Sequence, residues 1–141
     1  MDIRPATAAD APALAPLMAE LGYPTTAEEM AARLEVLRGR ADFATFVAEA
    51  DGAVAGMVGV TVSPSLYRSD LLGAIVALVV SSEFRGRGIA ARLVERGEQW
   101  LRDAGTRRAT VNPSIHRAEA HRLYERLGYA ATGVRFSKAL G

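Results

Sequence analysis

The chain has 141 residues, a length that predicts one domain over residues 1–141 with a buried core that needs no disulfide support. It contains no cysteine and two histidines, which excludes disulfides and cysteine-based metal centres and predicts no metal site of any kind. The net charge of +1 indicates no class of partner, and the absence of a membrane-length apolar run or signal-peptide segment predicts a cytoplasmic protein that binds no membrane.

The N-terminal part of the chain has the pattern of a strand and two helices. Residues 3–5 predict a short strand, and apolar residues at helical spacing between positions 14 and 21 predict the first helix. Thr26 and Glu29 have the spacing of a capping box, which predicts that a second helix begins there.

Extended patterns follow. Residues 45–50 and 53–62 predict two strands joined at Asp51-Gly52, a typical hairpin turn. The unbroken apolar run at residues 74–80 predicts a central strand that is buried on both faces.

The C-terminal part combines two amphipathic helices with short strands. The expected helices cover residues 89–104 and 120–127, and the expected strands cover residues 108–112, 129–132 and 134–140. The resulting order, β-α-α-β-β-β-α-β-α-β-β, predicts a mixed α/β fold with a sheet of about seven strands and four helices on its two faces.

Charge is distributed unevenly between the two parts of the chain. Residues 1–83 carry 5 basic and 11 acidic side chains, whereas residues 84–141 carry 12 basic and 5 acidic ones. Such asymmetry is typical of a site with one part for an anion and one for a cation, but two differently charged solvated surfaces produce the same pattern.

The most specific local pattern is the turn between the buried strand and the third helix, where Arg85, Gly86, Arg87 and Gly88 follow one another. Glycine lets backbone N–H groups approach a ligand closely, and the unpaired N–H groups at the start of a helix attract anions. The pattern therefore indicates a phosphate-binding turn, with an ordinary glycine-rich turn as the alternative. A dinucleotide fold is excluded, because its motif follows the first strand and requires an acidic residue about 20 positions later.

The segment Arg85-Gly-Arg-Gly88-Ile-Ala90 resembles the Arg/Gln-x-x-Gly-x-Gly/Ala signature of the GNAT superfamily of acetyl-coenzyme A-dependent N-acetyltransferases. The segment Tyr124-Glu-Arg-Leu-Gly128-Tyr129 is similar to a second block of that family, and residues 3–10 are similar to a common family start. These resemblances span the chain in the family's order. They imply a single GNAT domain with a mixed, mostly antiparallel central sheet.

The resemblance implies how coenzyme A would be held. Backbone amides of the glycine turn would bind its pyrophosphate, and the central strand would pair with the pantetheine arm. A bulge and a splay between that strand and residues 108–112 would admit the thioester. The cofactor-binding residues that follow from the resemblance are Leu78, Val79, Val80, Arg85, Gly86, Arg87, Gly88, Ile89, Ala90, Asn112 and Tyr124.

The resemblance also implies the catalytic groups. Tyr124 would direct its hydroxyl at the sulfur of the leaving thiol, either to protonate it or to stabilise the thiolate by a hydrogen bond. The backbone N–H of Val79 or Val80 would stabilise the oxyanion, with Val79 as the first choice. Some family members use a glutamate on the central strand as the base, whereas residues 73–81 contain no carboxylate.

The base and the acceptor site are therefore open. Glu49, Asp70 or a chain of water molecules are the candidate bases. The acceptor amine would enter beside the two N-terminal helices and residues 66–72, where acidic side chains could attract it or could simply be solvated helix charges. The candidate substrate residues are Glu20, Tyr23, Glu49, Asp70 and His116.

Taken together, the resemblance and the missing thiol nucleophile predict direct transfer of acetyl from acetyl-coenzyme A to a primary amine of a small molecule or protein. A non-catalytic acyl-coenzyme A sensor of the same fold is the alternative, because the strand carboxylate is missing. A nucleic-acid partner is disfavoured, because the basic residues are dispersed and aromatic residues are few. Members of the family are often dimers, so the resemblance allows a homodimer through residues 134–140, although no feature of the sequence decides the oligomeric state.

Overall fold

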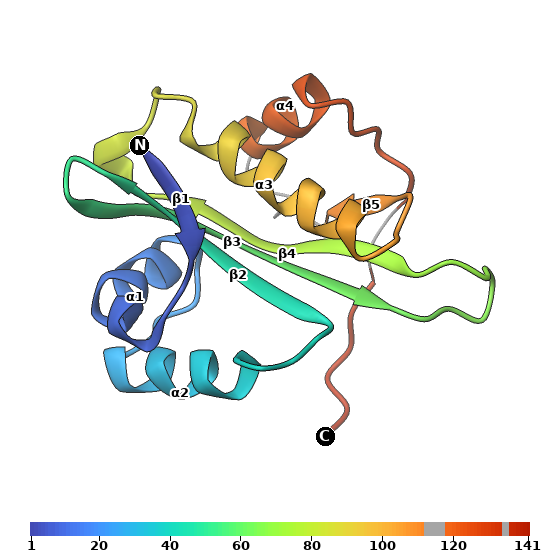
Figure 1. Cartoon of the computed structure of the whole chain (residues 1–141), viewed down its shortest axis with the longest axis horizontal. Coiled ribbons are helices and arrows are strands. Elements are labelled where there is room, and N and C mark those ends of the chain that lie inside the picture. The colour runs from blue at the N-terminus through green and yellow to red at the C-terminus, as the bar shows by residue number, and fades with distance from the viewer. Residues whose placement is uncertain (112–117, 134–135) are drawn as a thin grey trace.

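A mixed five-stranded sheet separates two groups of helices in the computed structural model, which describes residues 1–111, 118–133 and 136–141 (Figure 1). Its strands follow the order β1-β2-β3-β4-β5, with antiparallel pairing from β1 to β4 and parallel pairing between β4 and β5. The elements are β1 (Asp2–Pro5), the 3-10 turn η1 (Ala8–Asp10), α1 (Ala11–Glu20), α2 (Ala27–Leu37), β2 (Phe43–Ala50), β3 (Ala53–Ser63), β4 (Leu72–Val80), the 3-10 turn η2 (Ser82–Phe84), α3 (Ile89–Asp103), β5 (Ala109–Val111) and α4 (Ala118–Arg126).

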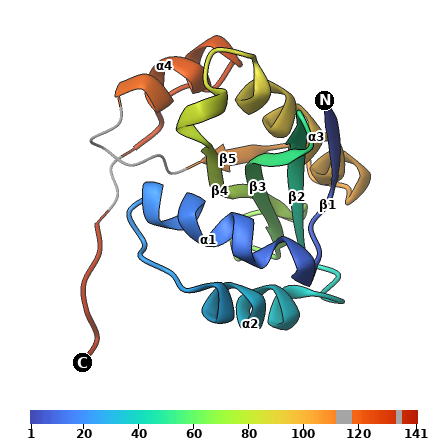
Figure 2. The same cartoon turned by 90° about the vertical axis from the view of Figure 1, so that its left-hand side faces the viewer.

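The helices form two layers, with α1 and α2 on one face of the sheet and α3 and α4 on the other (Figure 2). Each layer buries its own apolar cluster against the sheet, because successive side chains of a strand point to opposite faces. Met57 of β3 belongs to the cluster under α1 and α2, and its neighbour Val58 belongs to the cluster under α3. In β4, Ile75 and Val79 likewise belong to different clusters, so residues 74–80 contribute to both cores as predicted, although Val76 of that run is 52% exposed.

The predicted capping box begins α2. The backbone N–H of Glu29 donates to Thr26 Oγ1 at 3.0 Å, and the backbone N–H of Thr26 donates to Glu29 Oε1 at 2.9 Å. The predicted hairpin is also present, with Asp51 and Gly52 at positive φ between β2 and β3. Both elements could be predicted because their signals are short-range: the capping box pairs backbone N–H groups three positions apart, and the two hairpin residues adopt the turn conformation themselves.

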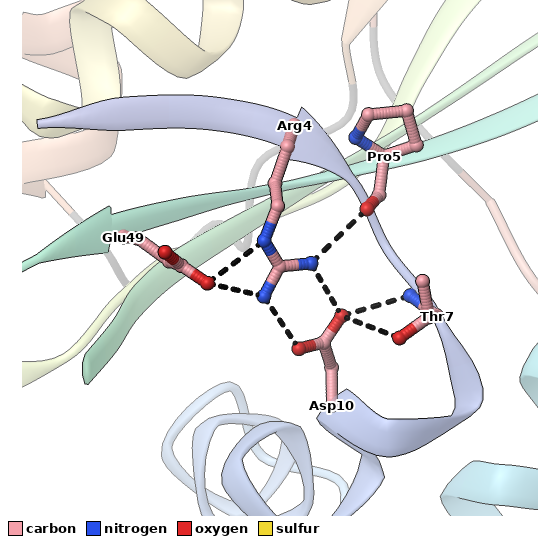
Figure 3. Close-up of polar contacts among 5 residues, drawn as sticks. All are labelled: Arg4, Pro5, Thr7, Asp10 and Glu49. Carbon is pink, nitrogen blue, oxygen red and sulfur yellow. Dashed lines mark hydrogen bonds and ion pairs between the residues drawn. The ribbon is translucent and has the colours of Figure 1, made fainter. Parts of the chain in front are cut away.

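An ion-pair cluster fixes the N-terminal strand to the rest of the fold (Figure 3). The guanidinium of Arg4 in β1 donates to Asp10 Oδ1 at 2.8 Å and to Glu49 Oε1 of β2 at 2.8 Å. Asp10 also accepts the backbone N–H of Thr7 at 2.8 Å. Because the hydrogen bond from Arg4 stabilises the carboxylate, the pKa of Asp10 lies below its usual range. The cluster thus ties β1, β2 and the start of α1 together.

The predicted fold class and four helices are confirmed, but the predicted strand count is wrong for the described residues. Residues 129–133 and 136–141 form no strand, and residues 134–135 lie outside the description. Figure 1 shows the C-terminal end lying apart from the sheet. Phe136 and Leu140 are 91% and 95% exposed, so the described residues of the strand expected at 134–140 lie in solvent. A strand forms only where another strand pairs with it, and no described residue pairs with residues 136–141.

Candidate active site

A bulge in β4 marks the centre of the candidate site. Gly59 of β3 pairs with Ala77 of β4, whereas the next residue, Val60, pairs with Ile75. Val76 is therefore left without a cross-strand partner, and it is 52% exposed. Such an extra residue bends a strand and increases its twist, so β4 changes direction at this point.

The pairing of β4 with β5 is confined to the part before this bulge. Gly73–Ile75 of β4 pair in parallel with Ala109–Val111 of β5. Beyond Ile75, no described residue pairs with β4 on that side, whereas β3 accompanies it to Val80 on the other. Among the described residues, β4 is thus unpaired on this side over residues 77–80, and we call this its open edge. The bulge agrees with the expected one, whereas the splay from residues 108–112 stays a prediction, because residues 112–117 lie outside the described part of the chain.

The register shows which peptide groups face the open edge. Ser81 donates its N–H to Ala55 O at 2.8 Å, and Val79 lies opposite Met57. Because the hydrogen-bonding direction alternates along an antiparallel strand, the N–H and C=O groups of Val79 point toward β3, and those of Leu78 and Val80 point toward the open edge.

A close contact supports this assignment. A Cβ on Gly56 would lie 2.8 Å from the Val79 carbonyl oxygen, which therefore faces β3. The N–H of Val79, the first-choice oxyanion donor, therefore points toward β3 and not toward the open edge. Val80, the other candidate, is directed to the open edge.

The glycine turn stands at the end of this edge. Gly86 and Gly88 have φ values of 81° and 75°, a left-handed conformation that glycine adopts without strain. Gly88 is the N-cap of α3 and supplies no side-chain acceptor, and the first turn of α3 contains no acidic residue. The first N–H groups of α3, including those of Ile89 and Ala90, are therefore suited to an external anion.

The two arginines of the turn differ in their surroundings. Arg87 Nη1 contacts Asp51 Oδ2 at 2.7 Å, and its guanidinium carbon lies 5.1 Å from the centre of the Phe84 ring. This ion pair connects the glycine turn to the turn between β2 and β3. Arg85 is exposed and makes no ion pair with any described residue. Arg85 is thus available to a bound anion, whereas Arg87 must give up its ion pair with Asp51 to bind one.

Tyr124 lies in the apolar cluster between α4 and α3. It is 6% exposed, and its ring makes an edge-to-face contact with Tyr129 at 5.7 Å between centroids. Burial raises the pKa of Tyr124 to about 12, so the hydroxyl is a hydrogen-bond donor at neutral pH. Tyr129 in turn donates its hydroxyl hydrogen to Glu98 Oε2 of α3 at 2.7 Å. Tyr129, which Glu98 holds by this hydrogen bond, therefore packs against the Tyr124 ring; neither residue was predicted as part of the site.

The candidate bases do not lie at the open edge. Glu49 contacts Arg4 and belongs to β2, two strands and therefore about 10 Å from β4. Asp70 precedes β4 at the end opposite Val80 and contacts Arg68 at 2.9 Å, a hydrogen bond that lowers the pKa of Asp70. Neither carboxylate is arranged as a base for chemistry beside Val80.

The remaining candidates are dispersed. Glu20 is the last residue of α1 and Tyr23 lies in the turn after it; both are exposed, with Tyr23 at 61%. Asn112 and His116 lie outside the described residues. The described part of the chain holds no group of three or more histidine, aspartate or glutamate side chains suited to a metal ion. Across residues 1–111, 118–133 and 136–141, no helix has the length and apolarity that a membrane crossing requires.

The family model and the two relatives given below, which match this chain in sequence, are all described as acetyltransferases. The model of the Acetyltransferase (GNAT) family matches residues 13–129. The aminoalkylphosphonate N-acetyltransferase of Salmonella typhimurium is 36% identical over 90 residues, which are 64% of this chain and 58% of that protein. The probable N-acetyltransferase family 8 member 5 of Mus musculus is 38% identical over 90 residues, which are 62% of this chain and 39% of that protein. The match thus spans less than two thirds of each relative.

Solved structures share the fold over nearly the whole chain. The glucosamine-6-phosphate N-acetyltransferase of Arabidopsis thaliana has a TM-score of 0.86 and 25% identity, covering 99% of this chain and 98% of that one. A protein described as a transcriptional regulator from Bacillus halodurans has a TM-score of 0.89 and 22% identity, covering 99% of both chains.

Proposed function

This chain belongs to the acetyltransferase (GNAT) family, and from that premise we propose that it transfers an acetyl group from acetyl-coenzyme A to a primary amine. The observation that carries the proposal is the open edge of β4, which ends at a glycine turn and the start of α3. An extended amide-containing arm fits such an edge, and a diphosphate fits such a helix start. Coenzyme A contains both groups in one molecule.

The backbone of this chain would bind the arm as an added strand. The N–H and C=O groups of Leu78 and Val80 face the open edge, so they can pair with the amides of the pantetheine arm. The amides of Gly86–Ala90 and the side chain of Arg85 would hold the phosphates. Asn112 stays a predicted contact to the arm. Acetyl-coenzyme A supplies the thioester, and no metal is required.

Two groups of the chain would stabilise charge during direct attack by the amine. The N–H of Val80 would donate to the carbonyl oxygen while the nitrogen–carbon bond forms. The hydroxyl of Tyr124 would donate to the sulfur as the carbon–sulfur bond breaks. With a tyrosine pKa of about 12 against about 8.5 for a thiol, full proton transfer from Tyr124 would cost about 5 kcal/mol. We therefore assign Tyr124 to stabilising the thiolate, with the amine proton passing to water.

One observation favours a second candidate, a non-catalytic acyl-coenzyme A sensor. The two candidate bases, Glu49 and Asp70, are engaged by arginines away from the open edge. A protein that only binds the thioester needs no base. The two functions share the same binding site and differ in the fate of the acetyl group.

Calorimetry and thiol release distinguish the two functions. Titration with acetyl-coenzyme A tests the shared site, and free-thiol release in the presence of small-molecule and peptide amines tests transfer. Saturable binding with amine-dependent thiol release supports the enzyme, and binding without release for any amine supports the sensor. The absence of binding at millimolar acetyl-coenzyme A would contradict both. The acceptor amine, the homodimer and the cytoplasmic location stay predictions.

A further inference from the structure

A second concave site lies at the β1 edge of the sheet. This groove has a volume of about 370 Å³ and is formed by the turn after β1, the end of α2, the start of β2 and the middle of α3. Two strands, β2 and β3, separate β1 from the open edge of β4. The groove is therefore distinct from the coenzyme A site proposed above.

The groove exists because β1 leaves the sheet early. β1 pairs with β2 between Phe46 and Glu49, and the last backbone contact runs from Ala6 N–H to Thr45 O at 2.9 Å. The chain then turns into η1. The first residues of β2, beginning at Phe43, thus extend past the end of β1, and the groove follows this uncovered edge.

Three aromatic side chains line the groove. Phe43, Phe46 and Trp100 line it, from a chain that has only nine aromatic residues in its 141 positions. Leu34 and Leu37 of α2 also line the groove. Such a lining favours a flat or apolar ligand body.

Arg96 gives the groove a positive charge. The guanidinium carbon of Arg96 lies 4.2 Å from the centre of the Phe46 ring, which holds the planar cation in place. Arg96 is half-buried and makes no ion pair or hydrogen bond with the rest of the described chain. A second cation, Arg38, lines the groove together with Glu35, with which it forms an ion pair at 3.6 Å, so Arg96 is the lining cation without a carboxylate partner among the described residues.

We propose that this groove binds a small carboxylate that carries an aromatic or short apolar body. The carboxylate would accept hydrogen bonds from the stacked Arg96 guanidinium, whose fork matches the two carboxylate oxygens. The body would lie against Phe43 and Trp100. The volume lies at the lower end of the range for small-molecule sites, which suits a ligand of this size.

Trp100 makes the proposal directly measurable, because it is the single tryptophan of the chain and it lines the groove. Phenylacetate is the probe, and tryptophan fluorescence of the full chain is the readout, with and without saturating coenzyme A. We expect a saturable change with a dissociation constant below about 1 mM in both conditions. Phenylacetamide has the same body without the charge, and we expect it to bind at least about tenfold more weakly.

Variants on α3 test the role of the arginine. Arg96→Gln should weaken phenylacetate binding at least about tenfold, and Arg96→Lys should fall between this variant and the wild type. Arg102→Gln is the matched control, because Arg102 is exposed on the same helix and does not line the groove. It should change the dissociation constant by less than about twofold. Circular dichroism confirms that each variant is folded.

Three results would overturn the proposal. The first is the absence of a saturable change up to about 10 mM phenylacetate, well above the affinity expected for such a site. The second is equal binding by the wild type and folded Arg96→Gln, or equal binding of phenylacetate and phenylacetamide. The third is loss of binding in the presence of coenzyme A, which would place the probe in the open edge of β4 instead.

Discussion

Replacing Gly88 by alanine separates the strain of the glycine turn from its role in binding. Gly88 has a φ of 75°, and a Cβ there would meet no atom of the chain within 4 Å. The cost in the unbound protein is therefore that of a left-handed alanine, about 1–2 kcal/mol. For a chain of this length, that corresponds to a fall in Tm of roughly 4–8 °C.

Gly105 provides a matched control at the other end of α3. Its φ is 92°, and a Cβ there would also meet no atom within 4 Å. Gly105→Ala should therefore lower the Tm by a similar amount while leaving coenzyme A affinity unchanged. Gly88→Ala should additionally raise the dissociation constant for coenzyme A at least about tenfold, equivalent to about 1.4 kcal/mol. Calorimetric titration of both variants measures this, and equal affinities would refute the assignment of the turn to phosphate binding.

Three further predictions concern the tyrosine, the sheet and the N-terminal cluster. Tyr124→Phe should lower turnover in thiol-release assays by about tenfold or more while coenzyme A affinity changes little, and unchanged turnover would remove Tyr124 from the reaction. Gly56→Ala should destabilise the protein by about 1–3 kcal/mol in urea unfolding, because its Cβ would lie 2.8 Å from the Val79 carbonyl oxygen; wild-type stability would show that β3 and β4 separate easily. The pKa of Asp10 is lowered in the folded protein, so its contribution is present above the unfolded value of about 3.9 and is lost as pH falls through the folded pKa. The stability difference between wild type and Asp10→Asn should therefore be constant near neutral pH and shrink below about pH 4, and a pH-independent difference would contradict this reasoning.

Most helices and the first strands could be predicted because their signals are local. The capping box at Thr26 and the hairpin turn at Asp51 satisfy nearby backbone groups, so they act wherever the chain folds. A bulge in this strand was expected only from the family resemblance. Its position at Val76 could not be predicted, because an unbroken apolar run has no alternation that reveals an extra residue. The strand expected at residues 134–140 has the right pattern but lacks a partner among the described residues.

Of the candidate site, the glycine turn could be predicted from the sequence, whereas the strand register and the contacts of Tyr124 could not. The glycine turn requires positive φ at two positions, and this requirement appears directly in the sequence. The choice between Val79 and Val80 depends on strand register, because a shift of one residue reverses every peptide group. The Tyr129–Glu98 contact joins residues 31 positions apart, and no local pattern indicates it.

The ion pair between Arg87 and Asp51 gives the glycine turn an internal anion before any ligand arrives. A phosphate that takes Arg87 does not create an ion pair but replaces one, and the released Asp51 carboxylate becomes hydrated. The electrostatic gain at this position is therefore a small difference between two exposed pairs. What the unbound protein gains is order: the arginine is already held over Phe84, so part of the entropy cost of fixing its side chain is met before binding.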